Sequence, residues 1–143
     1  MEIVTFKGLV YPSQCDAMGH MNTQFYTAAF DSAFWHLLHE CGYSTIWIAE
    51  RREGWVDVRH ELRFIKELRA GELFRISSHV DRIGRTSITS RHELLRLEDD
   101  QACAEIIIVS VYFDTEIRRK KEIPDLIRQR AGLFTKSGSV AFL

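Results

Sequence analysis

One stretch of this chain repeats its apolar side chains every three or four residues, and it sets the rest of the architecture. That spacing is typical of a helix with one face turned toward a core. Asn22 or Thr23 can act as the N-cap, and Gly42 stands where many helices end in the left-handed conformation. Such a helix, about 20 residues and about 30 Å long, can cross a whole sheet. Its apolar stripe consists of Tyr26, Phe30, Ala33, Phe34, Leu37, Leu38 and Cys41.

The segments around this helix have the patterns of strands. Residues 3–10 predict a first strand, which ends near Pro12. Residues 55–64 alternate apolar and polar side chains, as in a half-buried strand. Its apolar side would hold His60 beneath the helix, by default as a core histidine and alternatively as a residue that lines the substrate pocket. Three more strands follow at hairpin spacing. They are predicted at residues 73–83, 86–97 and 102–113.

The order of these elements predicts the fold class. Residues 106–111 are nearly all apolar, which is typical of a strand inside the sheet that is covered on both faces. Residues 43–54 are expected to be irregular or shortly helical, and Pro124 can open a short helix that runs to Ala131. A strand, a long helix and four antiparallel strands give an α+β class, a single domain over residues 1–143 with one long helix packed on an antiparallel β-sheet. The sheet face opposite the helix, where Trp55 and many charges are expected, is either solvated or a subunit contact.

The composition argues against several classes of partner. Nineteen basic residues against twenty acidic ones leave a net charge of −1, which does not favour nucleic acid or a membrane surface. No run of about 18 apolar residues predicts a transmembrane helix, and the N-terminal residues lack the features of a secretory signal. Cys15, Cys41 and Cys103 are an odd number of cysteines without paired spacing, which favours reduced thiols and a cytoplasmic protein.

The segment CDAMGHMN at positions 15–22 gathers an acid, a glycine, a histidine and an amide directly before the long helix. The first-turn amides of a helix lack partners inside it and lie at the positive end of its dipole, so they can polarise a carbonyl oxygen. A carboxylate that the loop brings back to this point can act as a base or a nucleophile. The same residues also suit a structural role, because Asp and Asn side chains often bond the amides of loops and caps. The pattern alone leaves both interpretations of Asp16 and Asn22 open.

The segment DAMGHMN at positions 16–22, ahead of a long helix, resembles the D-x-x-G-H-x-N motif of the 4-hydroxybenzoyl-CoA thioesterase family, whose members have the hotdog fold. Gly71-Glu72 before a strand, the hairpin turn at positions 83–87 and Pro124 after the last strand fit that family in the same order. The resemblance covers nearly the whole chain. It departs from the family at Gln14, where many relatives carry a second acid.

This resemblance implies an acyl-CoA thioesterase, a hydrolase that converts a thioester to free acid and CoA. Asp16 would be the nucleophile or the general base, and the backbone amide of Thr23 would polarise the thioester carbonyl. Gly19 would allow the substrate to approach the backbone closely. His20 and Asn22 would contact the substrate or support the loop.

The resemblance also implies a partner and a second binding region. Arg85 and Ser87, at the turn of a hairpin, would meet the nucleotide end of acyl-CoA, whereas the residues alone equally suit a solvated hairpin tip. The pocket of this fold lies between two subunits, so a homodimer or homotetramer is expected. No cofactor and no metal are implied. His36 and His39 lie one turn apart on the helix, but no third ligand has a supporting spacing.

Two other functions stay open on the sequence. A hydratase or dehydratase of the same fold uses a histidine and an acid on acyl thioesters, and His20 with Asp16 could serve that chemistry. A non-catalytic acyl-CoA-binding protein would need the same pocket without a working carboxylate. The acyl group also stays open, since the pattern is compatible with aryl, short, long or charged acyl chains.

Overall fold

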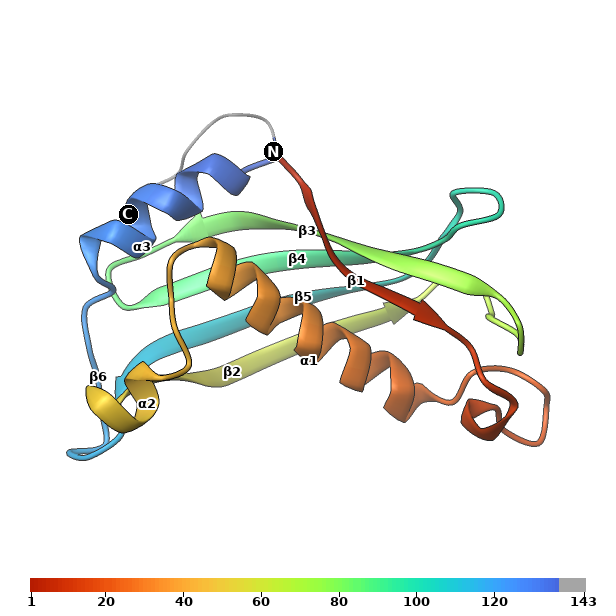
Figure 1. Cartoon of the computed structure of the whole chain (residues 1–143), viewed down its shortest axis with the longest axis horizontal. Helices are drawn as coiled ribbons and strands as arrows, with labels where there is room; N and C mark the ends of the chain where they lie inside the picture. Colours follow the sequence, from red (N-terminus) through yellow and green to blue (C-terminus); the bar gives the residue numbers. More distant parts are fainter. Residues whose placement is uncertain (137–143) are drawn as a thin grey trace.

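The computed structural model describes residues 1–136. Its centre is one antiparallel sheet with a long helix, α1 (Thr23–Glu40), lying across one face (Figure 1). The strand order is β1-β3-β4-β5-β2, and β6 pairs with β5. The strands are β1 (Ile3–Leu9), β2 (Glu53–Phe64), β3 (Leu73–Ile83), β4 (Ser87–Arg96), β5 (Ala102–Asp114) and β6 (Arg119–Lys120). The short helices are α2 (Trp47–Glu50) and α3 (Asp125–Ala131), with 3-10 turns η1 (Pro12–Gln14) and η2 (Gly132–Phe134).

The helix α1 forms where its apolar stripe predicts it, and every residue of that stripe is buried. It begins after Asn22, whose side-chain oxygen accepts a hydrogen bond from the amide of Gln24 at 3.2 Å. It is followed by Gly42, whose φ of +95° lies in the left-handed region. The local pattern therefore determines the start, the buried face and the end of the helix. The sheet residues that share its core include Ile76, Ile88, Leu94, Ile106 and Ile108.

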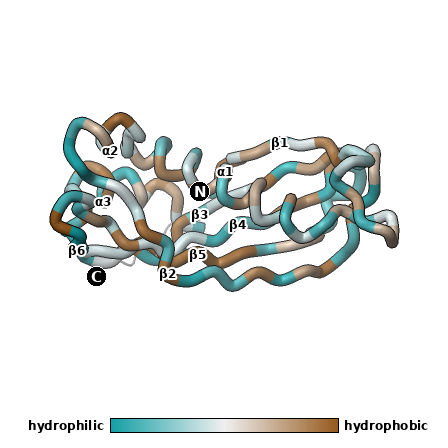
Figure 2. The backbone as a smooth tube through the Cα atoms, turned by 90° about the horizontal axis from the view of Figure 1, so that it is seen from below, coloured by the Kyte–Doolittle hydropathy of each residue, from teal (hydrophilic) through white to brown (hydrophobic). Residues whose placement is uncertain are grey.

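The strand β2 lies at the edge of the sheet, and its apolar residues are less covered than the alternation predicts. Val56, Val58 and Phe64 are 38%, 59% and 52% exposed. β2 has β5 as its one neighbour within the described chain, and the pairing shifts between Asp57 and Arg59, which leaves Val58 outside the ladder. Hydrophobic and hydrophilic residues still alternate along β2 in Figure 2. The prediction of a strand is confirmed, whereas the prediction of a half-buried one is wrong.

Two side chains of β2 differ from expectation, His60 because it lies at the sheet edge and Trp55 because the shift in the pairing with β5 changes which residues face α1. His60 pairs with the buried Ile108 and so lies on the helix side, but at the sheet edge its side chain is 36% exposed. It is therefore not a core histidine, and its Nε2 lies 2.8 Å from Oδ2 of Asp57. Trp55 also lies on the helix side rather than on the opposite face. It pairs with Tyr112, and the two rings meet edge-on with centroids 4.9 Å apart.

The remaining expectations for the sheet and the short helices need smaller corrections. Residues 106–111 do lie inside the sheet, between β4 and β2, but alternate residues of that run are only half-buried, so the strand is not covered on both faces. Pro124 stands directly before α3 rather than in its first turn, and α2 occupies part of the segment expected to be irregular or shortly helical. Within residues 1–136, no helix combines the length and the apolar character needed to cross a membrane.

A chain of buried polar side chains crosses the sheet beneath α1. The Nδ1 atom of His92 lies 2.5 Å from Oγ of Ser78, and its Nε2 lies 2.8 Å from Oγ of Ser90. Ser78 Oγ lies 2.7 Å from Oγ1 of Thr5, which donates to the carbonyl of Ile76 at 3.3 Å. Because Thr5 uses its proton on that carbonyl, Ser78 donates to Thr5, and His92 Nδ1–H donates to Ser78. Burial lowers the pKa of His92 to about 3, so at neutral pH Nε2 carries no proton and accepts from Ser90. The imidazole is therefore neutral, with its proton on Nδ1.

Candidate active site

The segment between β1 and α1 folds into a tight loop at the N-terminal end of the helix. The amide of Asp16 donates to the carbonyl of His20 at 2.9 Å, and the amide of Gly19 donates to the carbonyl of Asp16 at 3.0 Å. Gly19 has a φ of +83°, which disfavours any residue with a Cβ, and a Cβ there would meet no atom within 4 Å. Glycine is therefore needed here for its backbone conformation rather than for space inside the chain.

The carboxylate of Asp16 is held by this loop through one oxygen. Oδ1 accepts hydrogen bonds from the backbone amides of Met18 at 2.9 Å and His20 at 3.3 Å. Oδ2 accepts no hydrogen bond from residues 1–136, and the side chain is half-buried. The structural interpretation of Asp16 is thus correct for Oδ1, while Oδ2 is free for chemistry.

The first amide of α1 lies next to this loop. Asn22 caps the helix, and its own N–H donates to the carbonyl of Gln14 at 2.8 Å. The side chain of Gln14, in turn, accepts the amide of Tyr11 at 3.0 Å. The N–H of Thr23 has no hydrogen-bond partner in the described part of the chain, as expected for a first helical residue. It therefore offers a donor at the positive end of an 18-residue helix.

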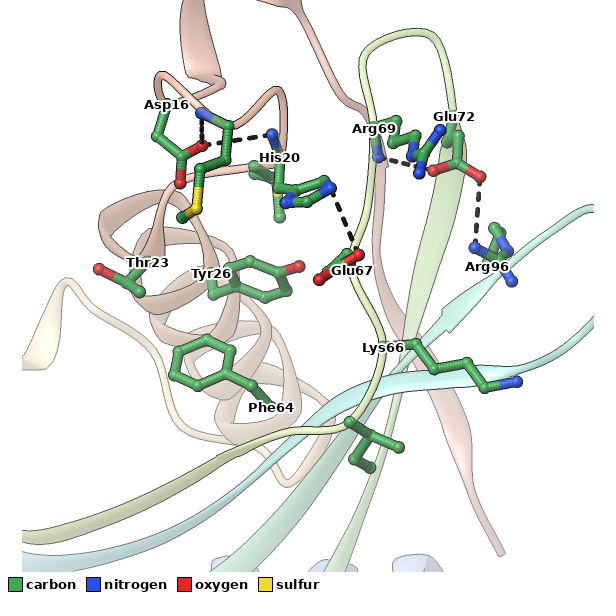
Figure 3. Close-up of a pocket in the computed structure, with 13 residues that line it drawn as sticks. Asp16, His20, Thr23, Tyr26, Phe64, Lys66, Glu67, Arg69, Glu72 and Arg96 are labelled. Carbon is green, nitrogen blue, oxygen red and sulfur yellow. Dashed lines mark hydrogen bonds and ion pairs between the residues drawn. The ribbon is translucent and has the colours of Figure 1, made fainter.

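Asp16, His20 and Thr23 line one hollow of about 860 Å³ (Figure 3). Its walls are the loop, the start of α1, the end of β2 with the segment that follows it, the turn that leads into β3, and the end of β4. Gly19 and Asn22 shape the loop without lining the hollow. The other lining residues are Met18, Met21, Tyr26, Phe64, Ile65, Lys66, Glu67, Arg69, Glu72 and Arg96.

Asn22 gives a first prediction, because its observed contact is with the helix start. Replacing Asn22 by alanine should lower the free energy of unfolding by about 1 kcal/mol, the usual loss for an N-cap. Asn22→Ser keeps an oxygen acceptor at the cap and should retain most of that stability. Urea denaturation of the three proteins measures the difference. Equal losses in both variants would contradict the capping role.

One wall of the hollow is apolar and partly open to solvent. Tyr26 of α1 and Phe64 of β2 meet edge-on, with ring centroids 5.2 Å apart. Burial, followed by the nearby charge of Cys103, raises the pKa of Tyr26 to about 12, so its hydroxyl stays protonated at neutral pH. Beside this pair, Met18 and Ile65 are 76% and 45% exposed. These exposed apolar side chains form a rim that nothing within the described chain covers.

The imidazole of His20 pairs with a residue that the sequence did not nominate. Its Nε2 lies 3.3 Å from Oε2 of Glu67, and Figure 3 shows the two side chains pointing toward each other across the hollow. The acid beside the His20 ring is thus Glu67, whereas Asp16 bonds the His20 backbone. Glu67 carries no signal in the sequence, because it lies in an irregular segment between two strands. Within residues 1–136, no three His, Cys, Asp or Glu side chains are grouped as metal ligands.

Arg85 and Ser87 lie at the other end of the sheet. They belong to the hairpin between β3 and β4, where Nε of Arg85 lies 3.1 Å from Oε1 of Glu122. Ser87 pairs with Val111, at the end of the sheet that also holds the start of β2. The hollow lies instead at the Phe64 end of β2. One copy of the chain therefore does not bring this hairpin to the loop of Asp16.

A comparison with protein families identifies the relationship. A family model described as the thioesterase-like superfamily matches residues 10–131, a range that includes the loop, α1 and every residue of the hollow. The chain belongs to this superfamily. No curated protein matches the sequence. The family that the motif at positions 16–22 predicts is thereby confirmed.

Solved structures similar to this thioesterase-superfamily chain share its architecture. A predicted thioesterase from Bacillus stearothermophilus has 22% identity and a TM-score of 0.82, covering 95% of this chain and 98% of that one. A mutant of 4-hydroxybenzoyl CoA thioesterase complexed with 4-hydroxybenzoyl CoA has 20% identity and a TM-score of 0.82, covering 91% and 98%. A hypothetical protein from Staphylococcus aureus in complex with CoA has 13% identity and a TM-score of 0.85, covering 94% and 85%. These likenesses confirm the hotdog fold.

Proposed function

We propose that this protein is an acyl-CoA thioesterase, which hydrolyses its substrate to a free acid and CoA. The observation that carries the proposal is that Asp16 and Thr23 line one hollow. The carboxylate of Asp16 has a free Oδ2, and the amide of Thr23, at the start of α1, has no partner in the described chain. Thioester hydrolysis needs these two functions, a base or nucleophile and a donor for the developing oxyanion.

In the proposed reaction, the thioester carbonyl oxygen accepts a hydrogen bond from the amide of Thr23. As a general base, Asp16 removes a proton from water while the water oxygen attacks the carbonyl carbon, and the C–S bond then breaks to release CoA thiolate. As a nucleophile, Asp16 attacks the carbon itself, CoA thiolate leaves, and water hydrolyses the resulting anhydride. A single turnover in ¹⁸O-labelled water that puts label into Asp16 would establish the nucleophilic route with water attack on the Asp16 carbonyl, because the general-base route labels only the product acid.

Other residues of the loop and of the hollow would support the reaction without reacting themselves. Gly19 and Asn22 hold the conformation that presents Asp16 beside the helix. His20, which is paired with Glu67, would contact the bound thioester next to the carboxylate. Tyr26 and Phe64 would pack against the substrate as an apolar wall.

A homodimer, alone or within a homotetramer, is part of the proposal. The outer edge of β2 has no strand beside it in the described chain, and Val56, Val58 and Phe64 are exposed along it. Antiparallel pairing of β2 with its copy about a two-fold axis would set the start of one strand beside the end of the other. The hairpin of Arg85 and Ser87 lies at the start of β2 and the hollow at its end. The hairpin of the second copy would thus approach the hollow of the first.

This arrangement predicts that a charge on the β2 edge separates the subunits. Val58→Lys should weaken the dimer at least tenfold and raise the KM for acyl-CoA, because lysine would bury its charge at the pairing edge. Val4→Lys is the matched control, since Val4 is 50% exposed on β1, the strand at the opposite edge. Light scattering after size-exclusion chromatography should give at least twice the chain mass of 16.7 kDa for wild type and Val4→Lys. A monomeric wild type, or equal dissociation of both variants, would contradict the pairing.

The test of the proposed function is the release of CoA, detected with a thiol reagent, from a panel of aryl-, short- and long-chain acyl-CoAs. Release with at least one acyl class supports hydrolysis and identifies that class. A second candidate, hydration or dehydration of an acyl thioester, is favoured by the His20–Glu67 pair, since such reactions use a histidine with an acid. Loss of an enoyl-CoA without free thiol would indicate that reaction. Binding of acyl-CoA without turnover would indicate a binding protein.

A further inference from the structure

The charged side chains of the hollow are not equally engaged. Arg96 forms two hydrogen bonds with Asp99, at 3.0 Å and 2.7 Å, and its Nη1 lies 3.4 Å from Oε2 of Glu72. The other oxygen of Glu72 accepts the backbone amide of Arg69 at 2.6 Å. The Arg96 guanidinium thus joins two carboxylates, and these contacts hold the turn before β3 in place. Arg96 and Glu72 are therefore structural parts of the wall.

Two cations at the same hollow have no carboxylate partner. The guanidinium of Arg69 forms no hydrogen bond or ion pair within residues 1–136, and Nζ of Lys66 donates to the neutral amide oxygen of Gln101 at 2.8 Å. Glu67, which lies between them in sequence, is paired with His20. Both cations are exposed at the border of the hollow (Figure 3). The three acids and three bases that line the hollow balance, and Lys66 and Arg69 differ from Arg96 in that neither has a carboxylate within ion-pair distance in the described chain.

The backbone that carries these two cations is fixed on both sides. The amides of Ile65 and Lys66 donate to the carbonyl of Cys103 on β5, at 2.8 Å and 3.1 Å. The amide of Met21, in the loop of Asp16, donates to the carbonyl of Leu68 at 2.8 Å, and the Leu68 side chain is fully buried. The segment is thus tied to the sheet and to the loop of Asp16. A ligand that binds there would have to fix the conformations of side chains, but the backbone is already held in place.

We propose that Lys66 and Arg69 bind the phosphate groups of the CoA nucleotide when acyl-CoA occupies the hollow, an assignment that takes its ligand from the proposed function. Guanidinium and ammonium groups form strong, charge-assisted hydrogen bonds with phosphate oxygens. The phosphates of CoA are separated from the thioester by the pantetheine arm, which suits cations at the border rather than beside Asp16.

Isothermal titration calorimetry with CoA, dephospho-CoA and pantetheine tests this inference. None of these ligands is a thioester, so binding is measured without hydrolysis. The double variant Lys66→Ala/Arg69→Ala should bind CoA at least tenfold more weakly than wild type does. Its affinity for pantetheine, which has no phosphate group, should be unchanged. Lys7→Ala, which removes an exposed cation on β1 at the opposite edge of the sheet, is the control and should bind like wild type. Added NaCl should weaken CoA binding to wild type more than to the double variant. Equal weakening of CoA and dephospho-CoA assigns the pyrophosphate to these cations, whereas weakening of CoA alone assigns the 3′-phosphate.

The inference is overturned if the double variant binds CoA as wild type does, if pantetheine binding falls equally, or if wild type does not bind CoA. Its failure is separate from that of the proposed function. A protein that binds CoA through Lys66 and Arg69 but releases no thiol from any acyl-CoA would keep this assignment and lose the thioesterase activity. If wild type releases thiol from acyl-CoA but the double variant binds CoA as wild type does, the thioesterase activity is kept and the phosphate assignment is lost.

Discussion

Replacing Asp16 by asparagine should lower kcat for acyl-CoA hydrolysis by a factor of about 10²–10⁴, the usual contribution of a positioned general base. The loss would be specific to the chemistry, because asparagine keeps an oxygen that can accept the amides of Met18 and His20, as Oδ1 does now. The loop and the amide of Thr23 should therefore keep their positions. Steady-state release of CoA, with circular dichroism to check the fold, measures the effect.

A second aspartate provides a matched control for this variant. Oδ1 of Asp114 also accepts two backbone amides, from Glu116 at 2.9 Å and Ile117 at 3.0 Å, but it lies outside the hollow. Asp114→Asn makes the same chemical change in a similar turn and should hydrolyse acyl-CoA as wild type does. Equal rates for Asp16→Asn and wild type would remove Asp16 from its assigned role. Equal losses in both variants would indicate a general effect of removing a turn carboxylate.

The sequence predicted α1 well because everything that defines the helix is local. Asn22, the apolar stripe and Gly42 lie in one continuous stretch, so the spacing alone indicates where the helix starts, which face it buries and where it ends. β2 was predictable as a strand but not as an exposed edge. Its neighbours depend on contacts between distant segments, and the shift beside Val58 arises only in the pairing with β5. Burial of Val58 and His60 therefore could not be derived from alternation.

The candidate site also combines residues that were predictable from a local pattern with residues that were not. Asp16 lies in the motif and Thr23 directly follows it, and both residues line one hollow. Glu67, Lys66 and Arg69 reach the same hollow only because the segment after β2 folds against the loop. No periodicity or spacing relates residues so far apart in the chain. Tertiary structure was needed to find the partner of His20 and the two unpaired cations.

Lowering the pH from 7 to 5 should reduce the free energy of unfolding by about 2 kcal/mol through His92 alone. Burial, with smaller effects from the charges of His79 and His60, lowers the pKa of His92 to about 3, against 6.5 for an ordinary histidine. Between these two values the unfolded chain binds a proton and the folded chain does not, so stability falls as the pH falls. The loss begins near pH 6.5 and stops near pH 3, where the folded state also binds the proton. Urea denaturation at pH 5, 6 and 7 measures it.

Removing the buried imidazole should remove this dependence. His92→Gln is expected to be less stable at pH 7, because it disturbs the bonds to Ser78 and Ser90, but its stability should change little between pH 7 and pH 5. His36→Gln, at an exposed position of α1, should keep the wild-type slope. Glu53, whose pKa is lowered because hydrogen bonds from Lys121 and Tyr112 outweigh its burial, loses its contribution only in more acidic solution, below the window of the measurement. If His92→Gln does not fold, ¹⁵N NMR of wild type at pH 5 decides the same question. A neutral ring protonated on Nδ1 supports the buried chain, and a doubly protonated His92 at that pH contradicts it.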